Sequence, residues 1–155
     1  MPRLIAWHRN PARRRPTLAT GASSGAGTNA RTIDDLRTWF ERINASLSER
    51  DAPWAFNMIA HSSYSRFDEE LALVEEYQPG LVITALGGPH RVTEQVHGYG
   101  GLVFADVNSP SFARKAIDKG ADGLVLVCAG AGGHTGEYAM LPFIEEVRQL
   151  FDGPL

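Results

Sequence analysis

Four short, continuously apolar segments alternate with segments of helical spacing from residue 53 onward, and this alternation constrains the fold more than any other feature. The apolar segments are 53–60, 81–86, 101–107 and 122–128. Continuous apolar runs are typical of parallel strands that are buried on both faces. Strand-helix units that repeat roughly every 20 residues predict a doubly wound sheet or a (β/α)8 barrel.

A closed (β/α)8 barrel needs eight strands and at least about 200 residues, whereas this chain of 155 residues offers four strands. We therefore predict an α/β fold with about four parallel strands that alternate with helices, either as a small open sheet or as a partial (β/α)8 TIM barrel. Helices are predicted at 31–47, 67–77, 90–100, 109–120 and 138–151.

The predicted helix ends carry recognisable cap residues. Thr32 is the expected N-cap of the first helix, and either Asn108 or Ser109 is the expected N-cap of the fourth. Pro110 then stands near the first helical position, and Gly120 is expected to end that helix.

The composition is that of an ordinary globular domain, with 43% hydrophobic and 21% charged residues and a net charge of −3. Nothing in this balance points to nucleic acid or to a membrane surface, and no run reaches the roughly 18 apolar residues of a membrane span. The single Cys128 excludes an internal disulfide, which favours a reducing, cytoplasmic location.

Residues 1–28 differ from the rest of the chain. Five arginines occur within the first 15 residues, and no acidic residue precedes Asp34. A transit peptide and a basic arm for nucleic acid are alternative interpretations. We interpret 1–28 as a disordered or non-homologous tail, and 29–155 as the folded domain.

Polar residues and glycines follow the predicted strands, where the ligands of parallel α/β folds bind. The most conspicuous set is the segment Ala129–Gly136, here called the glycine loop. Its glycines allow backbone N–H groups to approach a flat or anionic ligand, and His134 is a candidate general base near neutral pH. The alternative for His134 is a surface histidine satisfied by water.

The other strand-end residues have competing interpretations. Asn57 bonds either a neighbouring strand or a ligand, and Asp106 is interpreted as a loop or helix-cap residue. His90 and His97 share one predicted helix and are expected to face solvent. No cluster of cysteine, histidine and carboxylate residues predicts a metal site.

Four stretches resemble the nitronate monooxygenase family, formerly called 2-nitropropane dioxygenases. They are PWAFNMIAHSSYSRFDEELAL, PGLVITALGGP, GGLVFADVNSPSFARKAIDKG and GADGLVLVCAGAGGHTG, and the resemblance runs from residue 29 to residue 155. The resemblance implies a flavin-binding TIM barrel that holds flavin mononucleotide (FMN) without a covalent link. It also implies a small-molecule nitronate or nitroalkane substrate, oxidised with O2 to a carbonyl compound and nitrite.

The resemblance also implies the roles of individual residues. His134 matches the family's active-site base. Asn57, Gly132 and Gly133 match positions beside the flavin. His61, which follows the first predicted strand, and Gly136 of the glycine loop are predicted as substrate-binding residues.

Two departures from the family pattern stand out. Val127–Gly130 replaces a Gln-Gly-x-Glu sequence, which puts the substrate in doubt, and the chain matches only part of the barrel, which predicts a fragment. A flavin-dependent enoyl-acyl-carrier-protein reductase, which has a similar loop, is an alternative. A non-catalytic remnant is another, and its two open strand edges favour a homodimer.

Overall fold

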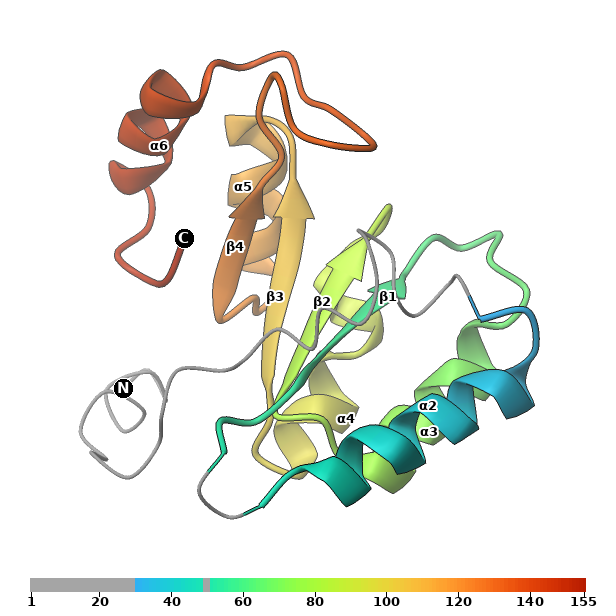
Figure 1. Ribbon diagram of the computed structural model, residues 1–155. Helices are drawn as coiled ribbons and strands as arrows, with labels where there is room; N and C mark the ends of the chain where they lie inside the picture. The colour runs from blue at the N-terminus through green and yellow to red at the C-terminus, as the bar shows by residue number, and fades with distance from the viewer. Residues whose placement is uncertain (1–29, 49–50) are drawn as a thin grey trace.

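The computed structural model describes residues 30–48 and 51–155. The predicted tail at 1–28 lies outside the described residues. Four strands form one sheet: β1 (Ala55–Ile59), β2 (Leu81–Ala85), β3 (Leu102–Val107) and β4 (Gly123–Leu126). All neighbouring strands are parallel, in the order β1-β2-β3-β4 (Figure 1).

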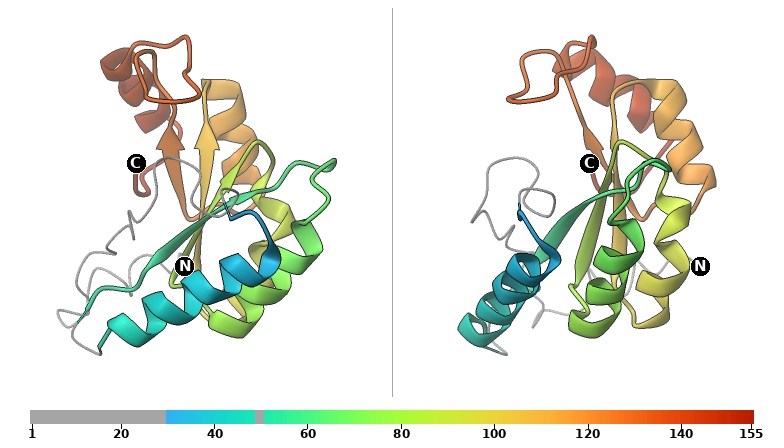
Figure 2. Two further views of the ribbon diagram at one scale, coloured as in Figure 1. Left: turned by 45° about the vertical axis from the view of Figure 1, so that its right-hand side comes forward. Right: turned by 90° about the vertical axis from the view of Figure 1, so that its right-hand side faces the viewer.

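Helices precede, connect and follow these strands, and they wrap one side of the twisted sheet (Figure 2). Their bounds are α2 (Ile33–Ser46), α3 (Phe67–Tyr77), α4 (Thr93–Gly98), α5 (Pro110–Asp118) and α6 (Met140–Arg148), with a short 3-10 helix η1 (Pro89–Arg91) before α4. Alternating parallel strands and helices confirm the predicted α/β fold.

The predicted helix caps agree with the structure. Thr32 caps α2 in a reciprocal capping box with Asp35, which satisfies backbone N–H groups that have no partner inside the helix. Ser109, rather than Asn108, caps α5 by accepting a hydrogen bond from the backbone N–H of Phe112. Gly120 follows α5 with a φ of +87°, a conformation that glycine adopts without steric cost.

The outer face of the sheet carries most of the core. Phe56 and Met58 of β1, and Val82 and Val103 beside them, pack under α2, α3 and α4 in one apolar cluster. Phe40 of α2 anchors this cluster, and its ring meets the Phe56 ring edge-on at a centroid distance of 4.8 Å. Burial of these side chains fixes which face of the sheet the helices cover.

The inner face is covered by none of these helices and is built from the alternate residues of each strand. Leu81, Ile83 and Leu102 form its centre, with Phe104 and Val125 packed against them. In a closed (β/α)8 barrel, this face forms the barrel interior.

Side-chain hydrogen bonds connect the amino ends of β3 and β4 to α4. His97 Nε2 lies 2.7 Å from Asp122 Oδ2, and the same oxygen accepts a hydrogen bond from the Val103 backbone N–H at 2.8 Å. The prediction that His97 faces solvent is therefore wrong, because its partner lies 25 residues further along the chain.

Candidate functional site

All four strands are parallel, so the segments that follow them meet at one edge of the sheet. In parallel α/β folds this carboxyl edge is where ligands bind. The glycine loop follows β4 at this edge, and the segment that contains His61 follows β1 (Figure 1). The structure therefore places the glycine loop and His61 at the same end of the sheet, after its two outer strands, whereas Asn57 lies within β1.

The glycine loop is closed on a single carbonyl group. The Cys128 carbonyl oxygen accepts hydrogen bonds from the backbone N–H groups of Ala131 and Gly136, both at 3.2 Å. It also accepts one from the Thr135 hydroxyl at 3.1 Å. These bonds bring the two ends of the loop together, so the residues between them project from the end of β4 as one turn.

Glycine is required at different positions of this loop for different structural reasons. Gly130 and Gly133 have φ values of +82° and +77°, which other residues rarely adopt. A Cβ atom on Gly136 would lie 1.9 Å from the Val127 carbonyl oxygen, so Gly136 permits a close backbone approach. A Cβ atom on Gly132 would meet nothing within 4 Å, which leaves open space beside that backbone.

His134 lies on the projecting part of the loop and is exposed. Within the described residues, no hydrogen bond or ion pair involves its ring. The ring is therefore free to meet a ligand placed over the carboxyl edge of the sheet, as a general base must.

Asn57 lies inside β1 and not at its end. It is the third of five strand residues, and it pairs in register with Ile83 on the inner face. It is half-buried, and among the described residues no hydrogen bond reaches its side-chain amide. The amide thus faces the barrel interior with its hydrogen-bonding groups available.

His61 follows β1 in a loop that is firmly held. Its Nδ1 accepts a hydrogen bond from the Ser63 backbone N–H at 3.2 Å and lies 2.7 Å from the Ser63 hydroxyl. Arg91 donates to the carbonyl oxygens of Ala60 and His61, and its guanidinium lies 3.4 Å from the centre of the Phe67 ring. These contacts fix the His61 backbone at the carboxyl edge while its side chain stays exposed.

Asp106 was not predicted as a site residue, and the structure corrects its interpretation as a loop or cap residue. It lies within β3, where it pairs in register with Val125 of β4. Its strand neighbours Ala105 and Val107 belong to the outer core, so Asp106 faces inward. Burial raises the pKa of its carboxyl from 3.8 to about 6. The sequence feature that could have indicated this inward-facing position is a charged residue placed between two apolar strand residues, Ala105 and Val107.

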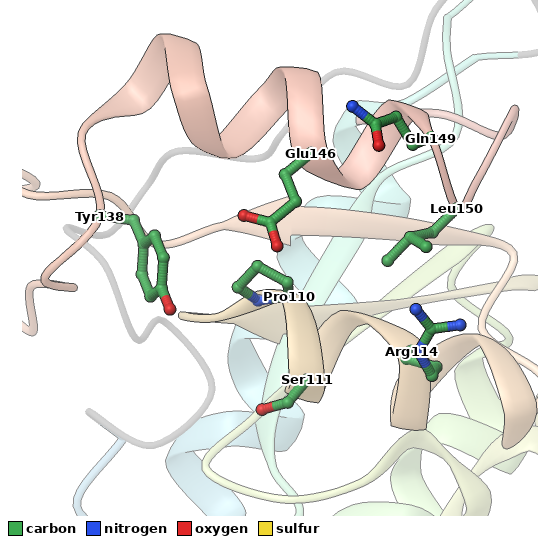
Figure 3. Close-up of a pocket in the computed structure, with 7 residues that line it drawn as sticks. All are labelled: Pro110, Ser111, Arg114, Tyr138, Glu146, Gln149 and Leu150. Atoms are coloured by element: carbon green, nitrogen blue, oxygen red, sulfur yellow. The ribbon is translucent and has the colours of Figure 1, made fainter.

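Two hollows lie near the end of the chain, around α6. One, of about 490 Å³, lies between α5 and α6, with Arg114, Tyr138 and Glu146 in its wall (Figure 3). The other, of about 560 Å³, runs along the open edge of β4 and reaches Ile83 and Phe104 on the inner face. No predicted site residue lines the first hollow. The second hollow adjoins the inner face of the sheet, which Asn57 and Asp106 also face.

Residues 30–48 and 51–155 contain no group of three or more histidine, cysteine, aspartate or glutamate residues arranged to hold a metal ion. Over the same residues, no helix is long and apolar enough to cross a membrane.

The sheet and its helices define part of a TIM barrel of the kind found in flavin enzymes. FabK from Thermotoga maritima is a similar solved structure, with a TM-score of 0.72 and 25% sequence identity over 83% of this chain and 40% of that chain. A mutant of the same FabK matches with a TM-score of 0.70 and 25% identity, over 79% of this chain and 40% of that one.

Nitroalkane oxidase from Streptomyces ansochromogenes has a TM-score of 0.73 and 17% identity, over 90% of this chain and 56% of that chain. The chain thus spans 40% to 56% of the length of these structures. No family model matches the sequence, and the comparison with curated proteins also finds no match.

Proposed function

We propose that this chain forms part of a flavin-dependent oxidoreductase of the nitronate monooxygenase type, with FMN as its cofactor. The observation that carries the proposal is the glycine loop, which holds an exposed histidine beside open backbone at the carboxyl edge of a partial flavin barrel. The fold shared with nitroalkane oxidase supports it.

The residues present fit one wall of a flavin site. The open space beside Gly132 and the left-handed backbone of Gly133 let a flat ring system lie against the loop. Asn57 offers an amide donor and acceptor from the inner face, to the polar edge of such a ring. When bound, the flavin would accept the substrate's electrons and pass them to O2.

His134 is the proposed catalytic base. Its Nε2 or Nδ1 would take the proton from the carbon next to the nitro group of a neutral nitroalkane. His61 and Gly136 are the proposed substrate-side residues. His61 supplies an exposed ring at the same edge, and the buried Gly136 holds the loop in place.

A reductase of the FabK type is the second candidate, and the 25% identity to FabK favours it over the 17% identity to nitroalkane oxidase. It would reduce an enoyl thioester with a reduced nicotinamide. A non-catalytic remnant, or a homodimer joined through the open edges of β1 and β4, is the third. A cytoplasmic location is also part of the proposal.

Titration of the purified chain with FMN, followed by flavin fluorescence, tests the cofactor. Saturable quenching at micromolar FMN is the result expected. A chain in which Gly133 is replaced by Val should bind more weakly, because a β-branched residue disfavours a φ of +77°. The absence of quenching by the unaltered chain would refute flavin binding by this chain.

Turnover separates the two enzyme candidates. Oxygen uptake with ethylnitronate or nitroethane is expected for the first candidate. In His134→Ala the uptake with nitroethane should be lost, because only the neutral substrate needs a base to remove its proton. Oxidation of reduced nicotinamide that depends on an enoyl thioester would instead establish the second. A change of apparent mass with protein concentration would reveal the homodimer.

A further inference from the structure

The two ring nitrogens of His61 have different surroundings, and this difference fixes which of them carries a hydrogen. Nδ1 accepts a hydrogen bond from the Ser63 backbone N–H at 3.2 Å, and the Ser63 hydroxyl oxygen lies 2.7 Å from the same nitrogen. A backbone N–H group can only donate, so Nδ1 must present its lone pair. In the neutral imidazole the ring hydrogen is therefore on Nε2.

The backbone of His61 is also held in place. Its carbonyl oxygen accepts hydrogen bonds from the Tyr64 backbone N–H at 3.1 Å and from the Arg91 guanidinium at 2.9 Å. A Cβ atom on Gly87 would lie 2.8 Å from the His61 backbone nitrogen, so the segment after β2 packs directly against this residue. Because its backbone and one ring nitrogen are bonded, His61 presents Nε2 in a fixed direction. A preorganised donor of this kind loses little conformational entropy when a ligand binds.

The exposed side of the His61 ring is the Nε2 side. Nε2 has no hydrogen-bond partner within residues 30–48 and 51–155, so it offers one N–H donor at the carboxyl edge of the sheet. His134 differs, because no hydrogen bond in the described part of the chain selects either of its tautomers. The two histidines are therefore suited to different tasks: His134 to take up a proton, and His61 to donate a hydrogen bond.

We propose that His61 binds an oxygen of the substrate's nitro group through Nε2–H, as a hydrogen-bond donor and not as a base. This inference rests on the proposed function and assigns a role within it. When His134 takes the proton from carbon, the electron pair of the C–H bond forms a C=N bond, and negative charge collects on the nitro oxygens. The bond from Nε2–H strengthens as that charge grows, because a neutral imidazole N–H stabilises an oxyanion. A nitronate carries the same charge from the start, so one donor serves both substrate forms.

Two substitutions separate the donor role from the other roles open to His61. Glutamine places an amide group near the position of Nε2, whereas asparagine places its amide near the position of Nδ1. His61→Gln therefore keeps a donor for the ligand and loses the contact with Ser63, and His61→Asn does the reverse. A general base would be lost in both variants, and a purely structural role would be lost in His61→Gln alone.

Nitrogen-15 NMR spectra of the ring nitrogens at about pH 8, above the ordinary pKa of histidine, show which nitrogen of His61 carries the hydrogen. The expected result is Nε2–H, with the His61 signals assigned by their absence in the variants. Ethylnitronate is then titrated into the FMN-free unaltered chain and both variants, and binding is followed by protein NMR shifts. His61→Gln should bind within about threefold of the unaltered chain, and His61→Asn about 10- to 100-fold more weakly, because it lacks a hydrogen bond to a charged oxygen.

A hydrogen on Nδ1 would overturn the inference. Equal affinity of the two variants, weaker binding by His61→Gln than by His61→Asn, or no binding of ethylnitronate by the unaltered chain would overturn it as well. Titration with FMN tests the proposed function separately. The expected order of affinities without any quenching of FMN fluorescence would support the donor role of His61 and refute flavin binding, whereas quenching together with the reverse order would refute the donor role alone.

Discussion

Substitution of Gly136 by Ala should disrupt the glycine loop, whereas the same substitution at Gly132 should not. At Gly136 the added Cβ would lie 1.9 Å from the Val127 carbonyl oxygen and 3.0 Å from its carbon. The backbones must separate by about 1.5 Å to restore ordinary contact, and overpacking of this kind costs about 1–3 kcal/mol. Loss of the hydrogen bond from Gly136 to Cys128 would add about 1 kcal/mol.

The expected loss of stability for Gly136→Ala is therefore about 2–4 kcal/mol. In a domain of this size, it corresponds to a decrease in Tm of roughly 4–16 °C. Gly132→Ala is the matched control, because its Cβ meets nothing within 4 Å. It should change stability by no more than about 0.5 kcal/mol.

Thermal and urea unfolding of the two variants, followed by circular dichroism, measure this difference. NMR shifts of the His134 ring show in the same samples whether the loop has moved. Equal unfolding midpoints together with unchanged His134 shifts in Gly136→Ala would refute the reasoning, because the close approach would then impose no constraint.

Substitutions at three further residues test other features of the structure. Burial raises the folded pKa of Asp106 to about 6, so this carboxyl stabilises the fold below its unfolded pKa and loses that contribution as pH rises. The unaltered chain should therefore lose about 2–3 kcal/mol of stability between pH 4 and pH 6.5, and Asp106→Asn should not. Urea midpoints measured against pH check this difference. Asp122→Ala should cost about 1–3 kcal/mol, since the Val103 N–H loses its acceptor, and Asp122→Asn should recover part of this in thermal unfolding. Arg91→Ala should lower the free energy of unfolding by about 2–3 kcal/mol, because it loses the contact with the Phe67 ring and two hydrogen bonds to carbonyl groups. An unfolding midpoint equal to that of the unaltered chain would contradict this prediction.

Local signals were sufficient to predict most of the fold. The strands are continuous apolar runs, and Thr32 and Gly120 act through the residues next to them in sequence. The predicted helix at 90–100 is instead divided into η1 and α4, with the non-helical Val92 (φ −121°, ψ −13°) between them. Arg91, the last residue of η1, donates to carbonyl groups of the distant loop at Ala60 and His61. That contact spans about 30 residues, and periodicity does not encode it.

The candidate site was predicted less completely. The glycine loop was recognised from its own sequence, and its location at the carboxyl edge follows from the parallel sheet. The inward direction of Asp106 depends on its strand position and its register with Val125, which no short motif specifies. Asn57 is likewise placed two residues inside β1, because β1 continues to Ile59 in register with β2.

The closure of the glycine loop on one carbonyl has a consequence for its amide hydrogens. The N–H groups of Ala131 and Gly136 share the Cys128 carbonyl oxygen as acceptor. When that carbonyl turns away, both amides lose their partner in the same event and become available to solvent together. Their hydrogens should therefore exchange with deuterium at closely matched rates, so that the two ends of the loop that presents His134 open as a single unit.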